Sequence, residues 1–223
     1  MKNKLTRLIE LTSIRPGTPP KDIMRVTKLA IDTQCRAVVV NYQDLGLVQK
    51  VKQANKSQIQ VVVVGGFPWA DRTWRDTLSF FKKDWDEVDI LIPISFYNLK
   101  ENHDKFLNDY LDPVKKIGKP IKLILETTWL RATYKEYWQL KLEALTKYCI
   151  QNDLIVKTNS GLVPHSFDEL VSEIKTIRKC SSKVRIKAAG GIKNLDQVKY
   201  LKSLGIYSIG TSSVELVNVL NKS

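Results

Sequence analysis

Short apolar runs alternate with longer segments of helical periodicity along the whole chain. Each apolar run is strand-length and rich in β-branched residues, and a turn and an amphipathic pattern follow it. The expected strands are residues 8–12, 37–41, 60–64, 88–92, 121–125, 154–157, 184–188 and 207–210. The expected helices are residues 21–33, 44–54, 73–83, 104–117, 133–152, 166–179, 195–204 and 213–220.

Eight strand–helix units in a row predict an α/β fold, in which helices cover a parallel sheet whose strands are apolar on both faces. Closed on itself, such a sheet is a (β/α)8 TIM barrel, and 223 residues suit one domain spanning residues 1–223. The alternative is an open doubly wound sheet, but the phosphate-binding glycine motif expected after its first strand is missing. The barrel interpretation directs attention to the carboxyl ends of the strands, where barrel active sites lie.

Two lysines interrupt the apolar runs of the sixth and seventh expected strands. Lys157 follows Leu154-Ile-Val, and Lys187 follows Ile186. If both side chains face the barrel interior, neighbouring strands bring the two ammonium groups together and lower the pKa of one of them. The neutral amine that results is a nucleophile. The alternative is structural: Lys157 reaches solvent from the strand end, and Lys187 points outward over a helix.

Two acidic residues also lie among apolar neighbours in expected strands. Asp89 stands in Glu87-Val-Asp-Ile-Leu, where a buried carboxylate needs a partner such as Lys187. The alternative is an aspartate that accepts hydrogen bonds from the backbone at the start of the strand. Glu10, in the first expected strand, has the same character and a less defined role.

Glycine-rich segments follow the last two expected strands. Gly190-Gly191 follows the seventh strand, and Gly210-Thr-Ser-Ser213 follows the eighth. Glycines let backbone N–H groups approach a phosphate. The N-terminus of the final helix carries the positive end of the helix dipole, which also favours an anion. Either segment alone reads as an ordinary turn, but barrels often bind phosphate after these two strands. Together they predict an anion site, to which Lys193 could add charge.

The composition is basic, with 36 Lys and Arg against 23 Asp and Glu and a formal net charge of +13. The lysines are spread along the chain without a block of like charge, which is typical of a solvated surface. The functional alternative is a positive field that attracts a phosphorylated substrate. A dedicated nucleic-acid surface is disfavoured.

The sequence also bears on compartment and metal binding. No apolar run reaches the roughly 20 residues that span a bilayer, and the basic start lacks an apolar signal core. Cys35, Cys149 and Cys180 stand far apart, which disfavours a disulfide framework and a zinc site. We therefore expect a cytoplasmic protein with no membrane partner.

These motifs, in this order, resemble the deoxyribose-phosphate aldolase family over residues 8–220. Val156-Lys-Thr-Asn-Ser-Gly161 is similar to the family's Schiff-base segment, usually Val-Lys-Thr-Ser-Thr-Gly. Residues 186–192 resemble the segment with the second lysine, and residues 209–213 resemble the phosphate-binding end. Weaker similarities cover residues 8–12, 37–41, 66–68, 87–89 and 124–127.

The resemblance implies reversible cleavage of 2-deoxy-D-ribose 5-phosphate to acetaldehyde and D-glyceraldehyde 3-phosphate, with neither metal nor organic cofactor. It implies that Lys157 forms the imine, that Lys187 lowers its pKa, and that Asp89 orients Lys187 and relays protons. Glu10 and Thr12 would lie near the substrate. It also implies a homodimer, which no feature of the sequence tests. The residues implied around the phosphate are Gly161, Gly190, Gly191, Gly210, Ser212 and Ser213.

Four departures from the family pattern bear on substrate preference and turnover. Glu10 replaces an aspartate, Val39 stands where many members have cysteine, and Tyr42 stands where they have proline. Asn159-Ser160 replaces Ser-Thr beside the nucleophile. The alternatives are therefore a related Schiff-base aldolase with another phosphorylated or aldehyde substrate, and a non-catalytic barrel that binds an anionic metabolite or nucleic acid.

Overall fold

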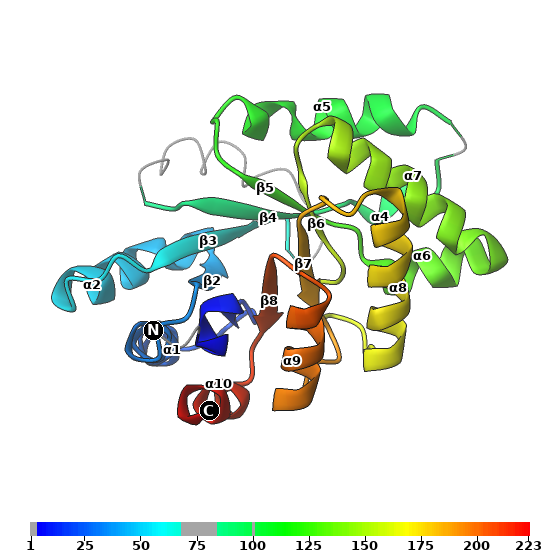
Figure 1. Ribbon diagram of the computed structural model, residues 1–223. Helices are drawn as coiled ribbons and strands as arrows, with labels where there is room; N and C mark the ends of the chain where they lie inside the picture. The colour runs from blue at the N-terminus through cyan, green and yellow to red at the C-terminus, as the bar shows by residue number, and fades with distance from the viewer. Residues whose placement is uncertain (1–3, 68–83, 100) are drawn as a thin grey trace.

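Eight parallel strands close into a barrel in which β8 pairs with β1 (Figure 1). The computed structural model describes residues 4–67, 84–99 and 101–223. The TIM barrel predicted from the sequence is confirmed, and the open sheet is wrong because β1 pairs with both β2 and β8. The strands are β1 (Ile9–Ser13), β2 (Ala37–Asn41), β3 (Gln60–Gly65), β4 (Glu87–Leu91), β5 (Ile121–Ile124), β6 (Ile155–Lys157), β7 (Ile186–Ala189) and β8 (Ser208–Thr211).

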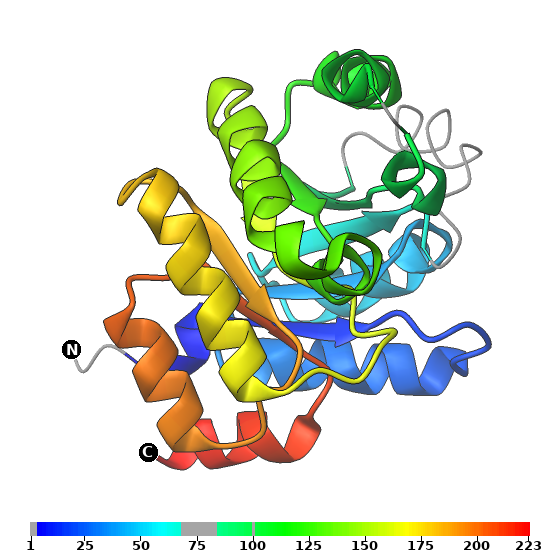
Figure 2. The same cartoon turned by 90° about the vertical axis from the view of Figure 1, so that its right-hand side faces the viewer.

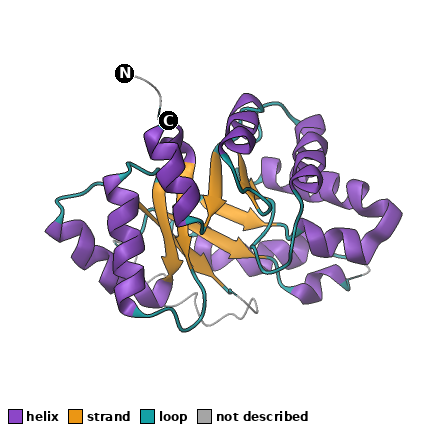
Figure 3. Ribbon diagram, turned by 90° about the horizontal axis from the view of Figure 1, so that it is seen from below, coloured by secondary structure: helices purple, strands orange, loops and turns teal. Residues whose placement is uncertain are grey.

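Helices surround the strands, as the views in Figures 2 and 3 show. In Figure 2 the helices α7 to α10 run from green to red along the outside of the barrel. Within the described ranges, none of the helices is long and apolar enough to cross a membrane. The α-helices are α1 (Pro20–Asp32), α2 (Leu45–Ala54), α4 (Ile94–Tyr97), α5 (His103–Lys115), α6 (Thr127–Tyr134), α7 (Trp138–Gln151), α8 (Phe167–Cys180), α9 (Leu195–Ser203) and α10 (Val214–Lys222). The 3-10 helices are η1 (Leu5–Leu8), η2 (Tyr42–Asp44) and η3 (Lys135–Tyr137).

The described α-helices differ from the sequence prediction in two main places, and a third expected helix is not tested. The single helix expected over residues 133–152 is wrong, because Lys135 takes a φ of 44° and ends α6 before η3 and α7 begin. The apolar pattern continues across this break, so periodicity alone joined the two helices. The short helix α4 was not expected, and the helix expected over residues 73–83 lies outside the described residues.

The two faces of the strands have different surroundings. On β2 and β3, Val38 and Val63 face outward and belong to the main core between barrel and helices. Alternate residues Ala37, Val39 and Val62 form a separate small apolar cluster with Val64 and Ile14. Successive strand residues point to opposite faces, so this second cluster fills one side of the barrel interior. The family departure at Val39 therefore lies in an apolar part of the interior.

Two loops at the carboxyl ends of the strands are held against each other. The loop after β7 passes the loop after β6 at Gly191, which has a φ of +68°. A Cβ at this position would lie 2.7 Å from the backbone oxygen of His165. Reciprocal capping hydrogen bonds between Ser166 and Glu169 begin α8 directly after the second loop. The close contact therefore requires glycine for two reasons, its backbone conformation and its lack of a side chain.

This contact predicts opposite effects for two glycine-to-alanine substitutions. Gly191→Ala should lower the free energy of unfolding by about 1–3 kcal/mol, because it combines a strained φ with a backbone clash. Gly46→Ala in α2 is the control, because no atom lies within 4 Å of its added Cβ. It should stabilise the protein by about 0.5–1 kcal/mol by restricting the unfolded chain. Urea unfolding measures both, and equal effects would contradict the close approach.

Candidate active site

Lys157 is the last residue of β6, and its side chain is almost completely buried. Its Nζ lies 2.8 Å from Oδ2 of Asp89, which comes from β4 on the other side of β5. Lys157 also stands directly opposite Lys187 in the register of β6 and β7. Closure of the barrel therefore brings an amine from one strand end beside a carboxylate and a second lysine.

Lys187 points into the barrel and is fully buried. Its Nζ donates to the same Oδ2 of Asp89 at 2.6 Å and to Oε2 of Glu10 at 2.5 Å. The outward orientation considered from the sequence is therefore wrong for Lys187, and the partnership expected between Lys187 and Asp89 is present. A single carboxylate oxygen is shared by two lysines.

Burial lowers the pKa of Lys157, because the charged ammonium loses its hydration there. The positive charge of Lys187 lowers it further. Asp89 and Glu10 act in the opposite direction by attracting the proton, but the net shift is downward. More of the Lys157 side chain is therefore present as a neutral amine at neutral pH than in water.

Below this pair, a further set of charged side chains extends to the amino-terminal end of the barrel. Lys122, on β5, lies 2.5 Å from Oε2 of Glu87 and 3.0 Å from Oε2 of Glu10. Arg36 precedes β2 and lies 2.8 Å from Glu10 and 2.6 Å from Glu87. The hydroxyl of Tyr207 donates to Glu87 at 2.8 Å. We call the seven charged residues the ionic cluster: Glu10, Arg36, Glu87, Asp89, Lys122, Lys157 and Lys187.

The three carboxylates of the ionic cluster have lowered pKa values despite their burial. Burial alone would raise the pKa of Asp89, but Lys157 and Lys187 outweigh it. The same holds for Glu10, where Lys187 and Lys122 outweigh burial. For Glu87, burial is outweighed by hydrogen bonds from Arg36 and by the charge of Lys122, and the pKa falls to about 2. All three groups therefore carry negative charge at neutral pH.

A cavity of about 780 Å³ opens above Lys157 at the carboxyl ends of the strands. Its walls come from the loops after β1, β6, β7 and β8. Among the described residues, those that line it include most of the residues expected from the sequence: Thr12, Lys157, Gly161, Gly190, Gly191, Gly210, Ser212 and Ser213. Two arginines that the sequence reasoning missed, Arg15 and Arg25, line it as well.

Glu10, Asp89 and Lys187 are not among the described residues that line the cavity. Glu10 is fully buried, and its carboxylate contacts Lys187, Lys122 and Arg36. The substrate contact expected for Glu10 stays a prediction, and the contacts that the structure shows for its carboxylate are those of the ionic cluster.

Two predicted phosphate residues also have structural roles. A Cβ on Gly210 would lie 3.1 Å from Cε of Lys187, so the absence of a side chain makes room for that lysine. The Ser213 hydroxyl accepts a hydrogen bond from the N–H of Leu216 at 3.0 Å and caps α10. Ser212 is exposed at the same cavity edge.

Asn159, one of the departures from the family pattern, is held in place by hydrogen bonds to residues that follow β5. Asn159 is buried, and its Oδ1 accepts hydrogen bonds from the hydroxyls of Thr127 at 3.0 Å and Thr128 at 3.2 Å. Glu126, which follows β5, accepts a hydrogen bond from the N–H of Ser160 at 3.0 Å. Burial raises the pKa of Glu126, and the Ser160 contact opposes this shift. These contacts join the ends of β5 and β6 beside Lys157.

The lowered pKa of Glu87 predicts how stability responds to acid. A carboxyl group with a pKa of about 2 in the fold and 4.5 in its ordinary state stabilises the fold above pH 4.5. That contribution, about 3 kcal/mol, is lost as the pH falls through the window between these values. Glu87→Gln should therefore show a shallower loss of unfolding free energy between about pH 5 and pH 3. Urea unfolding at several pH values measures the slope.

Asp112→Asn is the control, because Asp112 pairs with Lys116 on the exposed surface of α5. Its slope should follow that of the unsubstituted protein. A Glu87→Gln slope that also matches the unsubstituted protein would contradict the strong pairing of Glu87.

Comparison with curated proteins relates the chain to aldolases over nearly its full length. It is 29% identical to the deoxyribose-phosphate aldolase of Methanocella arvoryzae over 220 residues, covering 96% of this chain and 94% of the relative. It is 29% identical to that of Mycoplasmoides pirum, covering 97% and 98%, and 27% identical to that of Thermococcus kodakarensis, covering 95% and 94%. Comparison with protein-family models gives no match.

Solved structures show the same fold. An aldolase named QR15 superposes with a TM-score of 0.81 at 20% identity, covering 100% of this chain and 97% of that one. The tetrameric deoxyribose phosphate aldolase from Aeropyrum pernix gives 0.76 at 18% identity, covering 96% and 89%. The chain therefore has the fold of these aldolases, a lysine pair on β6 and β7, and similarity over nearly its full length to curated deoxyribose-phosphate aldolases.

Proposed function

We propose that the protein is a Schiff-base aldolase that reversibly cleaves 2-deoxy-D-ribose 5-phosphate to acetaldehyde and D-glyceraldehyde 3-phosphate. The observation that carries this proposal is Lys157, a buried amine of lowered pKa that lines the cavity beside Lys187. The near full-length similarity to proteins named deoxyribose-phosphate aldolase identifies the sugar phosphate.

The reaction begins when neutral Lys157 attacks the aldehyde carbon of the open-chain sugar. The resulting carbinolamine loses water and becomes a protonated imine, which attracts electrons from the neighbouring bond. The bond between the second carbon and the hydroxyl-bearing third carbon then breaks, and the third hydroxyl gives up its proton. D-glyceraldehyde 3-phosphate leaves, and an enamine stays on Lys157. Protonation of the enamine and addition of water release acetaldehyde and restore the amine.

The residues below Lys157 control its protons in this scheme. Oδ2 of Asp89 lies 2.6 Å from Nζ of Lys187 and 2.8 Å from Nζ of Lys157, so a water beside the amine could reach this pair. We assign to this pair, acting through a water, the transfer of the proton from the third hydroxyl. Lys187 also disfavours a second positive charge on Lys157.

The phosphate is assigned to the far side of the cavity. Gly161, Gly190 and Gly191 have positive φ values, which turn the loops after β6 and β7 so that backbone N–H groups can approach an anion. Ser212 and Ser213 stand at the start of α10, whose positive end favours a negative charge. Arg15 lines the same cavity and adds a cationic side chain. Binding energy from the phosphate positions the distant aldehyde for attack.

The proposal extends to the compartment, the oligomeric state and the metabolic role of the enzyme. We propose a cytoplasmic enzyme that works as a homodimer in deoxyribonucleotide catabolism. The scheme uses the protein's own side chains and water, without a metal or organic cofactor. The alternative of another phosphorylated or aldehyde substrate within the same chemistry is tested by assaying a panel of sugar phosphates and free aldehydes.

Lys157→Met should reduce turnover of deoxyribose 5-phosphate by at least about a thousandfold, because it removes the nucleophile. Borohydride reduction in the presence of substrate should leave an adduct on the Lys157 peptide of the unsubstituted protein and none on the variant. Lys116→Met is the control, since Lys116 is exposed directly after α5. Substantial activity in a pure, folded Lys157→Met variant would refute the assignment.

Arg15→Ala should raise KM for deoxyribose 5-phosphate by about tenfold, because a charge-assisted contact to the phosphate is lost. The KM for free deoxyribose should stay within about twofold, since that sugar has no phosphate to bind. Arg7→Ala, on the exposed side of η1, is the matched control. Equal increases for both sugars would place the phosphate elsewhere.

A further inference from the structure

We infer that Arg36, at the end of the barrel opposite the cavity, is a positioning residue that favours the neutral form of Lys157 by balancing the buried carboxylates of the ionic cluster. This inference rests on the proposed function, because it concerns the nucleophile of that reaction. It follows from the contacts and charges of the cluster.

The ionic cluster has one more cationic side chain than it has carboxylates. Its carboxylates are Glu10, Glu87 and Asp89, and its cationic side chains are Arg36, Lys122, Lys157 and Lys187. The guanidinium of Arg36 stays protonated at any pH that a folded protein tolerates. A buried site disfavours a surplus charge, so one of the three lysines is the group that gives up a proton.

The contacts identify that lysine. Lys122 lies within 4 Å of three carboxylates, with Glu87 at 2.5 Å, Glu10 at 3.0 Å and Asp89 at 3.6 Å. Lys187 contacts two, Glu10 and Asp89. Lys157 contacts Asp89 alone, and it shares that oxygen with Lys187. Lys157 therefore has the fewest carboxylate contacts to stabilise its charged form, so it is the lysine expected to lose its proton most readily.

Arg36 completes this balance from the amino-terminal end. Its side chain is 14% exposed, and its guanidinium spans Glu10 and Glu87 while lying over the ring of Tyr207. Without Arg36, three lysines would face three carboxylates. Each lysine would then neutralise one carboxylate, and the pKa of Lys157 would rise. The sequence gives no sign of this role, because Arg36 lies outside the strand and far along the chain from Glu87.

Other charged groups act on Lys157 from several strands of the barrel. They are Asp89 on β4, Glu126 after β5, Lys187 on β7 and Glu10 on β1. Lys122 on β5 lies 3.6 Å from Asp89 and acts through that carboxylate. Glu126 makes its hydrogen bond to Ser160, away from Arg36, and so contributes the same field with or without the arginine. The effect of Arg36 can therefore be measured as a difference between variants.

Arg36→Met should raise the pKa of Lys157 by about one unit, the order of magnitude expected when one positive charge of a buried cluster is lost. Competitive labelling with acetic anhydride across a pH series, read by peptide mass analysis, measures this pKa without any substrate. The acid limb of the kcat/KM profile for deoxyribose 5-phosphate should shift upward by the same amount. Its alkaline plateau should stay within about threefold, because the chemistry of the neutral amine is unchanged.

Two further variants test whether the direction of the change in the Lys157 pKa follows the sign of the charge that is removed. Glu87→Gln removes a carboxylate and should lower the pKa of Lys157. The double variant Arg36→Met with Glu87→Gln removes one charge of each sign and should bring the pKa back to within about 0.3 unit of its original value. A purely structural role for Arg36 predicts no such rescue.

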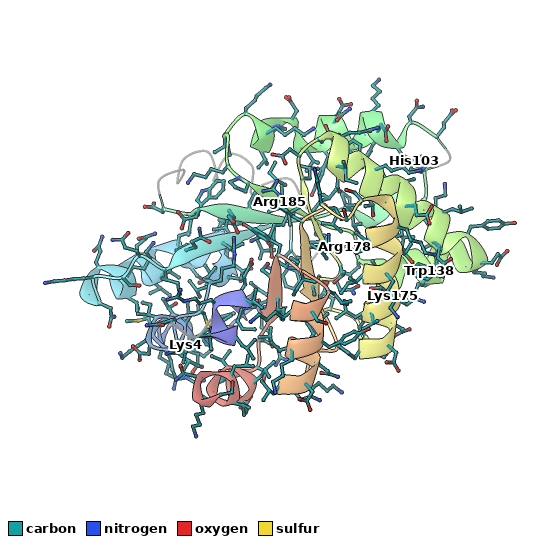
Figure 4. All side chains as sticks on the ribbon, in the orientation of Figure 1. Lys4, His103, Trp138, Lys175, Arg178 and Arg185 are labelled. Carbon is teal, nitrogen blue, oxygen red and sulfur yellow. The ribbon has the colours of Figure 1, made fainter. Side chains whose placement is uncertain are left out.

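Arg185→Met is the matched control. Arg185, labelled in Figure 4, stands just before β7 as Arg36 stands just before β2, but its side chain is 37% exposed and pairs with Asp153. Its loss should leave the pKa of Lys157 in place, because solvent screens its charge.

The inference is overturned if Arg36→Met and Arg185→Met give the same Lys157 pKa, or if the double variant does not restore it. If Arg36→Met does not fold, Glu87→Gln decides alone: a lower Lys157 pKa supports the inference, and an unchanged or higher one refutes it. The proposed function fails separately, if the folded unsubstituted protein neither cleaves the substrate nor forms the borohydride adduct.

Discussion

The shared contact of Lys157 and Lys187 with one oxygen of Asp89 is the interaction on which the site depends. An isolated ammonium group in a barrel interior would be very costly, and two of them would repel each other. Asp89 reduces the repulsion between them by accepting a hydrogen bond from each, but it supplies one negative charge for two amines. Lys187 has a second carboxylate contact, to Glu10, whereas Lys157, at the cavity, has the lowered pKa. The difference between the two lysines therefore arises because they share the Asp89 carboxylate but have unequal contacts with other carboxylates.

The barrel makes this sharing possible by bringing together residues that are distant in sequence. Closure places β1, β4, β6 and β7 around one interior, and the parallel register sets Lys157 opposite Lys187. The interior is divided between charged residues from those strands and the apolar cluster of β2 and β3. The apolar side excludes water and so strengthens the electrostatic interactions on the charged side. Gly210 contributes from β8 by leaving room for the Lys187 side chain.

Much of this arrangement could be predicted from the sequence, because a charged residue inside an apolar run is visible there. Asp89, Lys157 and Lys187 were identified in this way, and Lys122 shows the same signal in Ile121-Lys-Leu-Ile but was missed because no motif drew attention to it. Arg36 gave no signal, since its partner Glu87 lies 51 residues away and only the folded barrel joins them. The break at Lys135 was hidden for a different reason, because an unusual backbone conformation leaves apolar periodicity unchanged.

The ionic cluster is difficult to explain by stability alone. Buried ion pairs recover little more than their desolvation cost, and well-packed apolar residues of similar volume often stabilise a protein as much or more. A barrel interior filled with small apolar residues such as valine, as on β2 and β3, would serve the fold equally well. What an apolar interior cannot do is fix the protonation of an amine at its edge. The cluster extends from Lys157 to Arg36 through residues in mutual contact, so a charge at the base of the barrel can influence the amine at its top. If Lys157 is the nucleophile as proposed, this continuity gives the amino-terminal end of the barrel a part in setting its reactivity.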